Sequence, residues 1–94
     1  MSDLFAVAGK RVLVTGGTRG IGRAISIQLA RAGASVVANY VRNDEAADSL
    51  KKEMTACGAL LEICRADVSN QEGISRLIEA IGSEPLAAFV HCAA

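Results

Sequence analysis

The sequence lacks an excess of charge of either sign. Its 94 residues carry 10 lysines and arginines and 10 aspartates and glutamates, which gives a formal net charge of +0 at pH 7. The basic residues are scattered along the chain, so no basic block provides the electrostatic surface typical of a nucleic-acid-binding protein. We therefore expect no nucleic-acid partner.

The chain also lacks long apolar runs and a leader pattern. No apolar run approaches the roughly 18 residues that a membrane span needs. Residues 1–5 show no basic region followed by an apolar one. These absences predict a cytoplasmic protein with no membrane partner.

Cysteine is scarce, and its spacing excludes two common uses. Cys57, Cys64 and Cys92 are odd in number and have neither Cys-x-x-Cys nor Cys/His ligand spacing. A disulfide framework and a zinc site are both disfavoured by this pattern. We expect three reduced, mostly packed thiols and no metal site.

Strand and helix patterns alternate through the chain. Apolar runs typical of strands cover residues 10–15, 34–40, 60–64 and 86–90, and apolar residues recur at helical spacing in residues 20–32, 43–57 and 70–82. Short connections between them predict an α/β fold with a parallel sheet. Right-handed crossovers, with a reversal before the fourth strand, predict the strand order 3-2-1-4. The pattern β-α-β-α-β-α-β is thus the N-terminal half of a Rossmann doubly wound parallel sheet.

Local patterns predict where the third helix begins and how the three helices pack on the sheet. Ser69 and Glu72 form a capping box for the third helix. The first two helices are expected on one face of the sheet and the third on the other. The first helix is expected to bury one apolar face, made of Ile21, Ala24, Ile25, Leu29 and Ala32.

A glycine-rich turn, Thr15-Gly16-Gly17-Thr18-Arg19-Gly20-Ile21-Gly22, lies between the first strand and the first helix. Glycines let a backbone approach a pyrophosphate closely, and the free N–H groups at the start of the helix face its negative charge. The alternative is a merely structural strand-to-helix turn. Because strand, glycines and helix occur in the required order, we interpret the segment as a dinucleotide site. Its expected cofactor contacts are Gly16, Thr18, Arg19, Gly20, Ile21 and Gly22.

The spacing Gly16-x-x-x-Gly20-x-Gly22, preceded by Thr15, resembles the short-chain dehydrogenase/reductase family. It differs from the G-x-G-x-x-G of the commoner dinucleotide motif. The similarity is almost position by position over residues 10–25 and extends along the whole chain, with 3-oxoacyl-acyl-carrier-protein reductases most alike. The resemblance implies an oligomeric oxidoreductase with a nicotinamide cofactor, in fatty acid or polyketide metabolism.

The end of the second strand indicates which cofactor is bound. An acidic residue there would bind both ribose hydroxyls and exclude a 2′-phosphate. Residues 38–42 read Ala-Asn-Tyr-Val-Arg and contain no carboxylate. The planar guanidinium groups of Arg19 and Arg42 suit a 2′-phosphate, and in the family a basic residue before the second glycine likewise marks NADP(H). We predict NADP(H), bound at this strand end by Asn39, Tyr40 and Arg42; a solvated cation is the alternative for Arg42 and for Arg19.

Two further strand ends complete the predicted site. The resemblance implies that Asp67 accepts a hydrogen bond from the adenine amine and that Val68 packs on the ring; local capping is the alternative for Asp67. Residues 91–94 read His-Cys-Ala-Ala where the family has Asn-Asn-Ala-Gly. In the family the backbone of this segment lies against the cofactor, so the resemblance implies cofactor contacts at His91, Cys92 and Ala93. We interpret His91 as structural, because no acid/base partner is identifiable, and Cys92 as packed rather than nucleophilic.

The Tyr-x-x-x-Lys pair expected of a short-chain reductase is absent from this chain. The single tyrosine, Tyr40, is followed four residues later by Asp44. We therefore predict no catalytic residue here. Residues 1–94 are interpreted as the N-terminal part of one dinucleotide-binding domain, incomplete without a C-terminal piece that carries Ser, Tyr and Lys. Without that piece, Leu86, Phe89 and Val90 would form an open apolar edge.

The predicted function is the NADP(H)-binding half of a reductase that acts on a carbonyl, with a 3-oxoacyl thioester as the favoured substrate. The complete unit would be an NADPH-dependent enzyme, whereas this chain alone would be inactive. Two alternatives remain open: an enoyl thioester reductase of the same family, and a non-catalytic NADP(H)-binding or assembly subunit.

Overall fold

Four parallel strands form one sheet in the order β3-β2-β1-β4 in the computed structural model, which describes residues 8–92. This order confirms the predicted half of a doubly wound sheet. Along the chain the elements are β1 (Arg11–Thr15), α2 (Gly20–Arg31), β2 (Ser35–Tyr40), α3 (Asp44–Ala56), β3 (Leu61–Arg65), α4 (Gln71–Ile81) and β4 (Leu86–His91).

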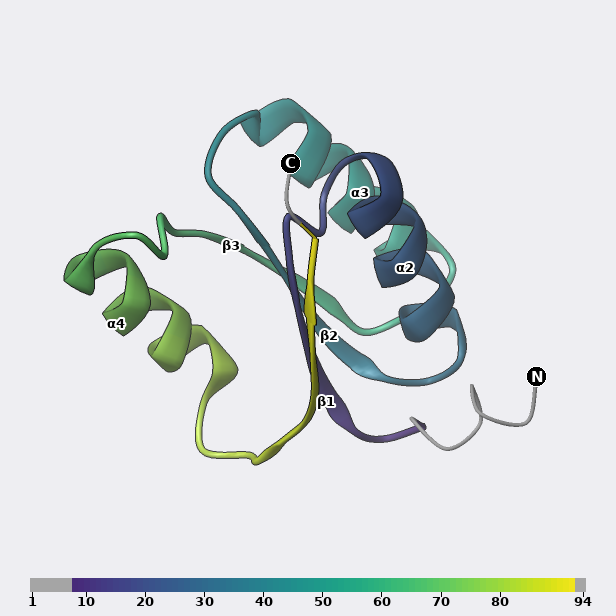
Figure 1. The fold of residues 1–94 in the computed structure, drawn as a ribbon. Coiled ribbons are helices and arrows are strands. Elements are labelled where there is room, and N and C mark those ends of the chain that lie inside the picture. Colours follow the sequence, from purple (N-terminus) through teal and green to yellow (C-terminus); the bar gives the residue numbers. More distant parts are fainter. Residues whose placement is uncertain (1–7, 93–94) are drawn as a thin grey trace.

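Helices cover both faces of the sheet, as Figure 1 shows: α2 and α3 lie on one side and α4 on the other. Successive strand residues point to opposite faces. Val12 and Val14 therefore belong to the main core cluster, beneath α2 and α3. Leu13 and Val37 face α4 and pack with Leu77. The continuous apolar run in β1 is explained because both faces of that strand are buried.

Helix α2 meets the sheet through its smallest side chains. Gly22, Ser26 and Ala30 are buried, whereas Ile21 is 78% exposed and Ile25 is half-buried. Because residues four apart share one helix face, these small residues form a stripe that lets α2 approach the strands closely. The predicted apolar face is therefore wrong at Ile21 and at Ala24, which is also exposed. Close packing selects small residues on the face that meets the sheet, and hydrophobic spacing does not detect this.

Helix α4 is capped by Asn70, so the predicted Ser69–Glu72 capping box is wrong. The Asn70 carboxamide oxygen accepts a hydrogen bond from the Gly73 N–H at 2.7 Å. Ser69 instead donates its hydroxyl and its N–H to the Asp67 carboxylate, at 2.6 and 2.9 Å. This local turn occupies Ser69 and moves the start of the helix by one residue.

The three cysteines are free thiols, but their burial differs from the prediction. Cys57 is exposed at the end of α3, which corrects the expectation of a packed side chain. Cys64 and Cys92 are half-buried. Burial raises the pKa of the Cys64 thiol, which keeps it protonated and weakly reactive.

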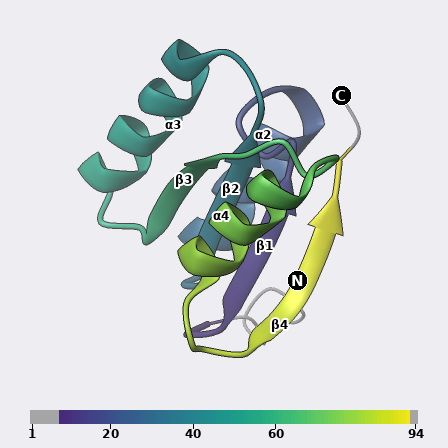
Figure 2. The ribbon, with the colours of Figure 1, turned by 90° about the vertical axis from the view of Figure 1, so that its left-hand side faces the viewer.

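Strand β4 lies at the edge of the sheet, beside α4 rather than beneath it (Figure 2). Phe89 is 58% exposed and Leu86 is also exposed, as the open apolar edge predicts. Val90 departs from that prediction, because it is half-buried and packs against the main core cluster.

Gly73 lies on the first turn of α4, against the backbone of Asp67. A Cβ at this position would overlap the Asp67 carbonyl oxygen. Alanine ordinarily stabilises a helix by about 1 kcal/mol relative to glycine, but this overlap reverses the sign. We expect Gly73→Ala to lower the free energy of unfolding by about 1–3 kcal/mol in denaturant titrations. Ser75→Ala, at an exposed position of the same helix, is the matched control; a Gly73→Ala variant as stable as this control would contradict the close contact.

Candidate functional site

The carboxyl ends of the four strands meet at one edge of the sheet, and every predicted site residue that the structure describes lies there. Thr15, the last residue of β1, pairs in register with Asn39 and with His91. Asn39 in turn pairs with Cys64, near the end of β3. Ala93, the remaining predicted contact, lies outside the described residues.

Hydrogen bonds fix the glycine turn to its neighbours on three sides. The Gly17 N–H donates to the Asn39 carbonyl of β2 at 3.0 Å, and the Cys92 N–H donates to the Thr15 carbonyl at 3.1 Å. The buried Ser26 hydroxyl of α2 donates to the Gly17 carbonyl at 2.9 Å. The turn is thus held by both adjacent strands and by the helix that follows it.

The glycines of the turn have different roles. A Cβ on Gly16, whose φ is +63°, would overlap the Cys92 carbonyl oxygen, and one on Gly22 would overlap the Gly16 carbonyl oxygen. These two glycines therefore permit backbone contact between β1, β4 and α2. Gly20 has a φ of +56°, but a Cβ there would meet no heavy atom within 4 Å. It provides the left-handed conformation on the open side of the turn.

The N-terminus of α2 differs from those of the other described helices. Arg19, its N-cap residue, makes no side-chain capping bond, and the first turn contains no acidic residue. In contrast, α3 and α4 are capped by Asn43 and Asn70 and carry acidic residues in their first turns. Free N–H groups and an uncompensated positive dipole end form a site for an anion.

The side chains of the glycine turn differ in their exposure to solvent. Arg19 is exposed, as is Ile21, whereas Thr18 is only 2% exposed. The Thr18 side chain therefore lies inside the turn, while the Arg19 guanidinium group is available at its surface.

Asn39 connects β2 to the end of β3. Its side chain is buried, and its Nδ2 donates to the Cys64 carbonyl at 3.1 Å and to the Ala66 carbonyl at 3.0 Å. Arg42 is the exposed cation at the end of this strand. Cofactor contact by Asn39 and Arg42 stays a prediction.

Asp67 forms a local turn before α4 but does not cap the helix, since the cap is Asn70. One of its carboxylate oxygens remains available. Both hydrogen bonds from Ser69 go to Oδ1, so among the described contacts Oδ2 can still accept from a ligand. These hydrogen bonds, with a smaller contribution from the nearby Arg42 guanidinium, hold the pKa of Asp67 below its usual range. Val68 beside it is partly exposed.

A cavity of ≈ 270 Å³ opens beside Asp67, between the end of β3 and the start of α4. The glycine turn lies outside it. Basic, acidic, polar and apolar residues all line it: Val41, Arg65, Ala66, Asp67, Asn70, Glu72, Gly73 and Arg76.

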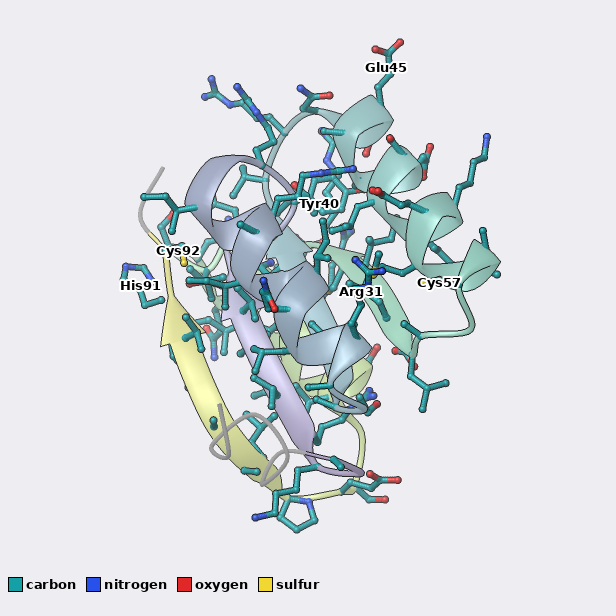
Figure 3. The ribbon with its side chains drawn as sticks, turned by 90° about the vertical axis from the view of Figure 1, so that its right-hand side faces the viewer. Arg31, Tyr40, Glu45, Cys57, His91 and Cys92 are labelled. Carbon is teal, nitrogen blue, oxygen red and sulfur yellow. The ribbon has the colours of Figure 1, made fainter. Side chains whose placement is uncertain are left out.

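His91 and Cys92 lie together at the end of β4 (Figure 3). The His91 Nδ1 is 2.7 Å from the Thr15 hydroxyl oxygen, a hydrogen bond that joins β4 to β1. Cys92 packs against the main core cluster. Both contacts favour the structural interpretation of these side chains.

Within residues 8–92, no group of three or more His, Cys, Asp or Glu residues could hold a metal ion. None of the described helices is both long enough and apolar enough to cross a membrane.

A doubly wound sheet with a glycine turn at its carboxyl edge defines an α/β protein with the Rossmann fold. Comparison with known families gives the particular group. The model of the family described as short chain dehydrogenase matches residues 10–94. The chain belongs to the short-chain dehydrogenase/reductase family.

Similar proteins include oxidoreductases of several kinds. The uncharacterized oxidoreductase YgfF of Escherichia coli (strain K12) is 41% identical over 81 residues, which are 84% of this chain and 33% of that protein. Versicolorin reductase 1 of Aspergillus parasiticus is 41% identical over 78 residues, 83% of this chain and 30% of that protein. The solved Pseudomonas aeruginosa RhlG/NADP active-site complex superposes with a TM-score of 0.79 at 37% identity, covering 99% of this chain and 38% of its own.

These comparisons confirm the family but do not single out 3-oxoacyl-acyl-carrier-protein reductases. The chain spans about a third of the length of the curated relatives it matches.

Three residues that shape the site were not predicted from the sequence: Arg65, Asn70 and Gly73. Gly73 had a usable signal, since a glycine inside a helical pattern lowers helix stability and often has a packing reason. Arg65 had none, because its partner Asp44 lies 21 residues away in the sequence.

Tyr40 is buried, and its hydroxyl donates to Asp44 Oδ1 at 2.8 Å. Burial, followed by the Asp44 hydrogen bond and charge, raises the pKa of Tyr40 from 10.0 to about 12. Because the folded pKa is above the unfolded one, the stability this group contributes is complete below pH 10 and is lost as the pH rises through 12.

A spectrophotometric titration of the phenolate tests this value without ambiguity, because the chain has one tyrosine. We expect a midpoint near pH 12. In Asp44→Asn the midpoint falls but stays above 10.0, since burial is the largest cause of the shift. A midpoint at 10.0 in the parent protein would contradict the burial of Tyr40.

Proposed function

We propose that this chain is the NADP(H)-binding part of a short-chain reductase that reduces a carbonyl group. The observation that carries this proposal is the uncapped N-terminus of α2 beside the exposed Arg19, in a turn fixed by backbone contacts. Family membership supports a nicotinamide cofactor, and a similar solved structure is described as an NADP complex.

Each binding residue has a proposed partner on the cofactor. The free N–H groups that begin α2 bind the pyrophosphate, while Arg19 and Arg42 bind the 2′-phosphate. Asp67 Oδ2 accepts from the adenine amine, and Val68 packs on the ring. The bound cofactor supplies a hydride to the substrate carbonyl. The contribution of this chain is to bind and orient that cofactor. Further proposed contacts are Gly16, Thr18, Gly20, Ile21, Gly22, Asn39, Tyr40, His91, Cys92 and Ala93.

We further propose that these residues form one part of a single domain, completed by a C-terminal piece that carries Ser, Tyr and Lys. The chain spans about a third of its relatives' length. Phe89 on β4 and Ile74 and Ile78 on α4 are exposed apolar side chains, which further elements of the fold would cover. The complete unit would form a homo-oligomer in the cytosol, where free thiols stay reduced.

An assay of the complete protein with NADPH tests the reaction. We expect NADPH oxidation with a 3-oxoacyl thioester and little with the matching enoyl thioester. The reverse preference would favour an enoyl reductase. NADPH binding without oxidation by either substrate would favour a non-catalytic NADP(H)-binding or assembly subunit.

Arg19→Ala tests the assignment of the cofactor. Loss of a charged hydrogen bond to the 2′-phosphate is expected to weaken NADPH binding by about 1.5–3 kcal/mol. NADH binding should change little, because NADH has no such phosphate. Titration calorimetry with both cofactors measures the difference, and Arg31→Ala, on the last turn of α2, is the matched control. Equal weakening of both cofactors would exclude Arg19 from the 2′-phosphate site.

A further inference from the structure

The connection between β2 and α3 consists of three residues, and both residues that flank Arg42 are held by hydrogen bonds. Before it, the Val41 carbonyl accepts from Arg65 Nε at 3.2 Å. After it, the Asn43 side chain accepts from the Ala46 N–H at 3.0 Å, with Asn43 in the left-handed region at a φ of 69°. Arg42 is therefore the middle residue of a loop whose backbone is fixed on each side.

Arg65 joins this loop to the helix that follows it. Its Nη1 donates to Asp44 Oδ2 at 3.0 Å, while Asp44 Oδ1 accepts from the Tyr40 hydroxyl at 2.8 Å. A single guanidinium group thus binds the loop backbone at Val41 and the first residue of α3. We call these three side chains, Tyr40, Asp44 and Arg65, the loop clasp.

The Arg65–Asp44 ion pair of the loop clasp contributes little to overall stability. The side chains of Arg65 and Asp44 are 58% and 57% exposed, and exposed ion pairs contribute about 0–1 kcal/mol. Its effect is local, because both arms of Arg65 act on the segment that carries Arg42. That segment is adjacent to Asp67, where the Arg42 charge is felt.

We propose that Arg65 is a positioning residue for cofactor selection: with Asp44 it holds the residue 41–43 loop so that Arg42 meets the 2′-phosphate of NADP(H). This inference rests on the proposed function. It assigns the preference for NADPH partly to a side chain on β3, which acts through Arg42. A preorganised loop increases affinity because less ordering is needed on binding.

Arg65→Gln in the complete protein tests the proposal. If the fraction of loops in the binding conformation falls to about a tenth, the NADPH dissociation constant rises about tenfold, while that of NADH stays within about twofold. Arg65→Lys should behave like Arg65→Gln, because lysine keeps the charge but cannot reproduce the two-armed geometry. Arg31→Gln, on the last turn of α2, is the matched control and should leave both constants unchanged. Thermal unfolding verifies that each variant is folded.

A double-substitution cycle separates this inference from the proposed function. If Arg65 acts through Arg42, the variant carrying both Arg42→Gln and Arg65→Gln binds NADPH no more weakly than Arg42→Gln alone. Additive losses, or full NADPH affinity in Arg65→Lys, would show that Arg65 acts through its charge and would overturn the positioning role. Normal NADPH selectivity in Arg65→Gln would overturn it while leaving the proposed function intact. Failure of the parent protein to bind NADPH would overturn both.

Discussion

Backbone contact at the glycine turn is the constraint on which the rest of the structure depends. The carbonyl of Cys92 lies against Gly16, and the carbonyl of Gly16 lies against Gly22, so that β4, β1 and α2 meet without side chains between them. Any side chain at these positions would separate the strand pair from the helix. The small-residue stripe of α2, continued by Ser26 and Ala30, extends this close approach along the sheet.

The same contact explains the position of the proposed anion site. Because α2 is held so close to the ends of the strands, its N-terminus lies at the carboxyl edge of the sheet. The helices α3 and α4 begin nearby, but Asn43 and Asn70 satisfy N–H groups there. The three helix starts thus differ electrostatically because of their cap residues. Among the described helices, only α2 has a first turn whose N–H groups are not capped by a side chain and can bind a ligand.

Prediction from the sequence succeeded for the order of the strands and failed for the packed face of α2 and for contacts that were local or distant. The strand order followed from the alternation of buried strands such as β1 with amphipathic helices. The cap of α4 was wrong, because Ser69 and Asn70 are both good caps and the turn at Asp67 decides between them. Arg65 could not be predicted, since its contacts with Val41 and Asp44 exist only after β2 and β3 pair.

NADP(H) binding by the glycine turn and the ends of β2 and β3 is the central proposal. It is tested most directly by backbone amide NMR spectra recorded during titration of the complete protein with NADPH. If NADPH binds there, the largest shifts occur at residues 17–22, with further shifts at Arg42 and Val68. Unchanged amides in the turn, with shifts confined to residues 58–61 at the opposite edge of the sheet, would contradict it.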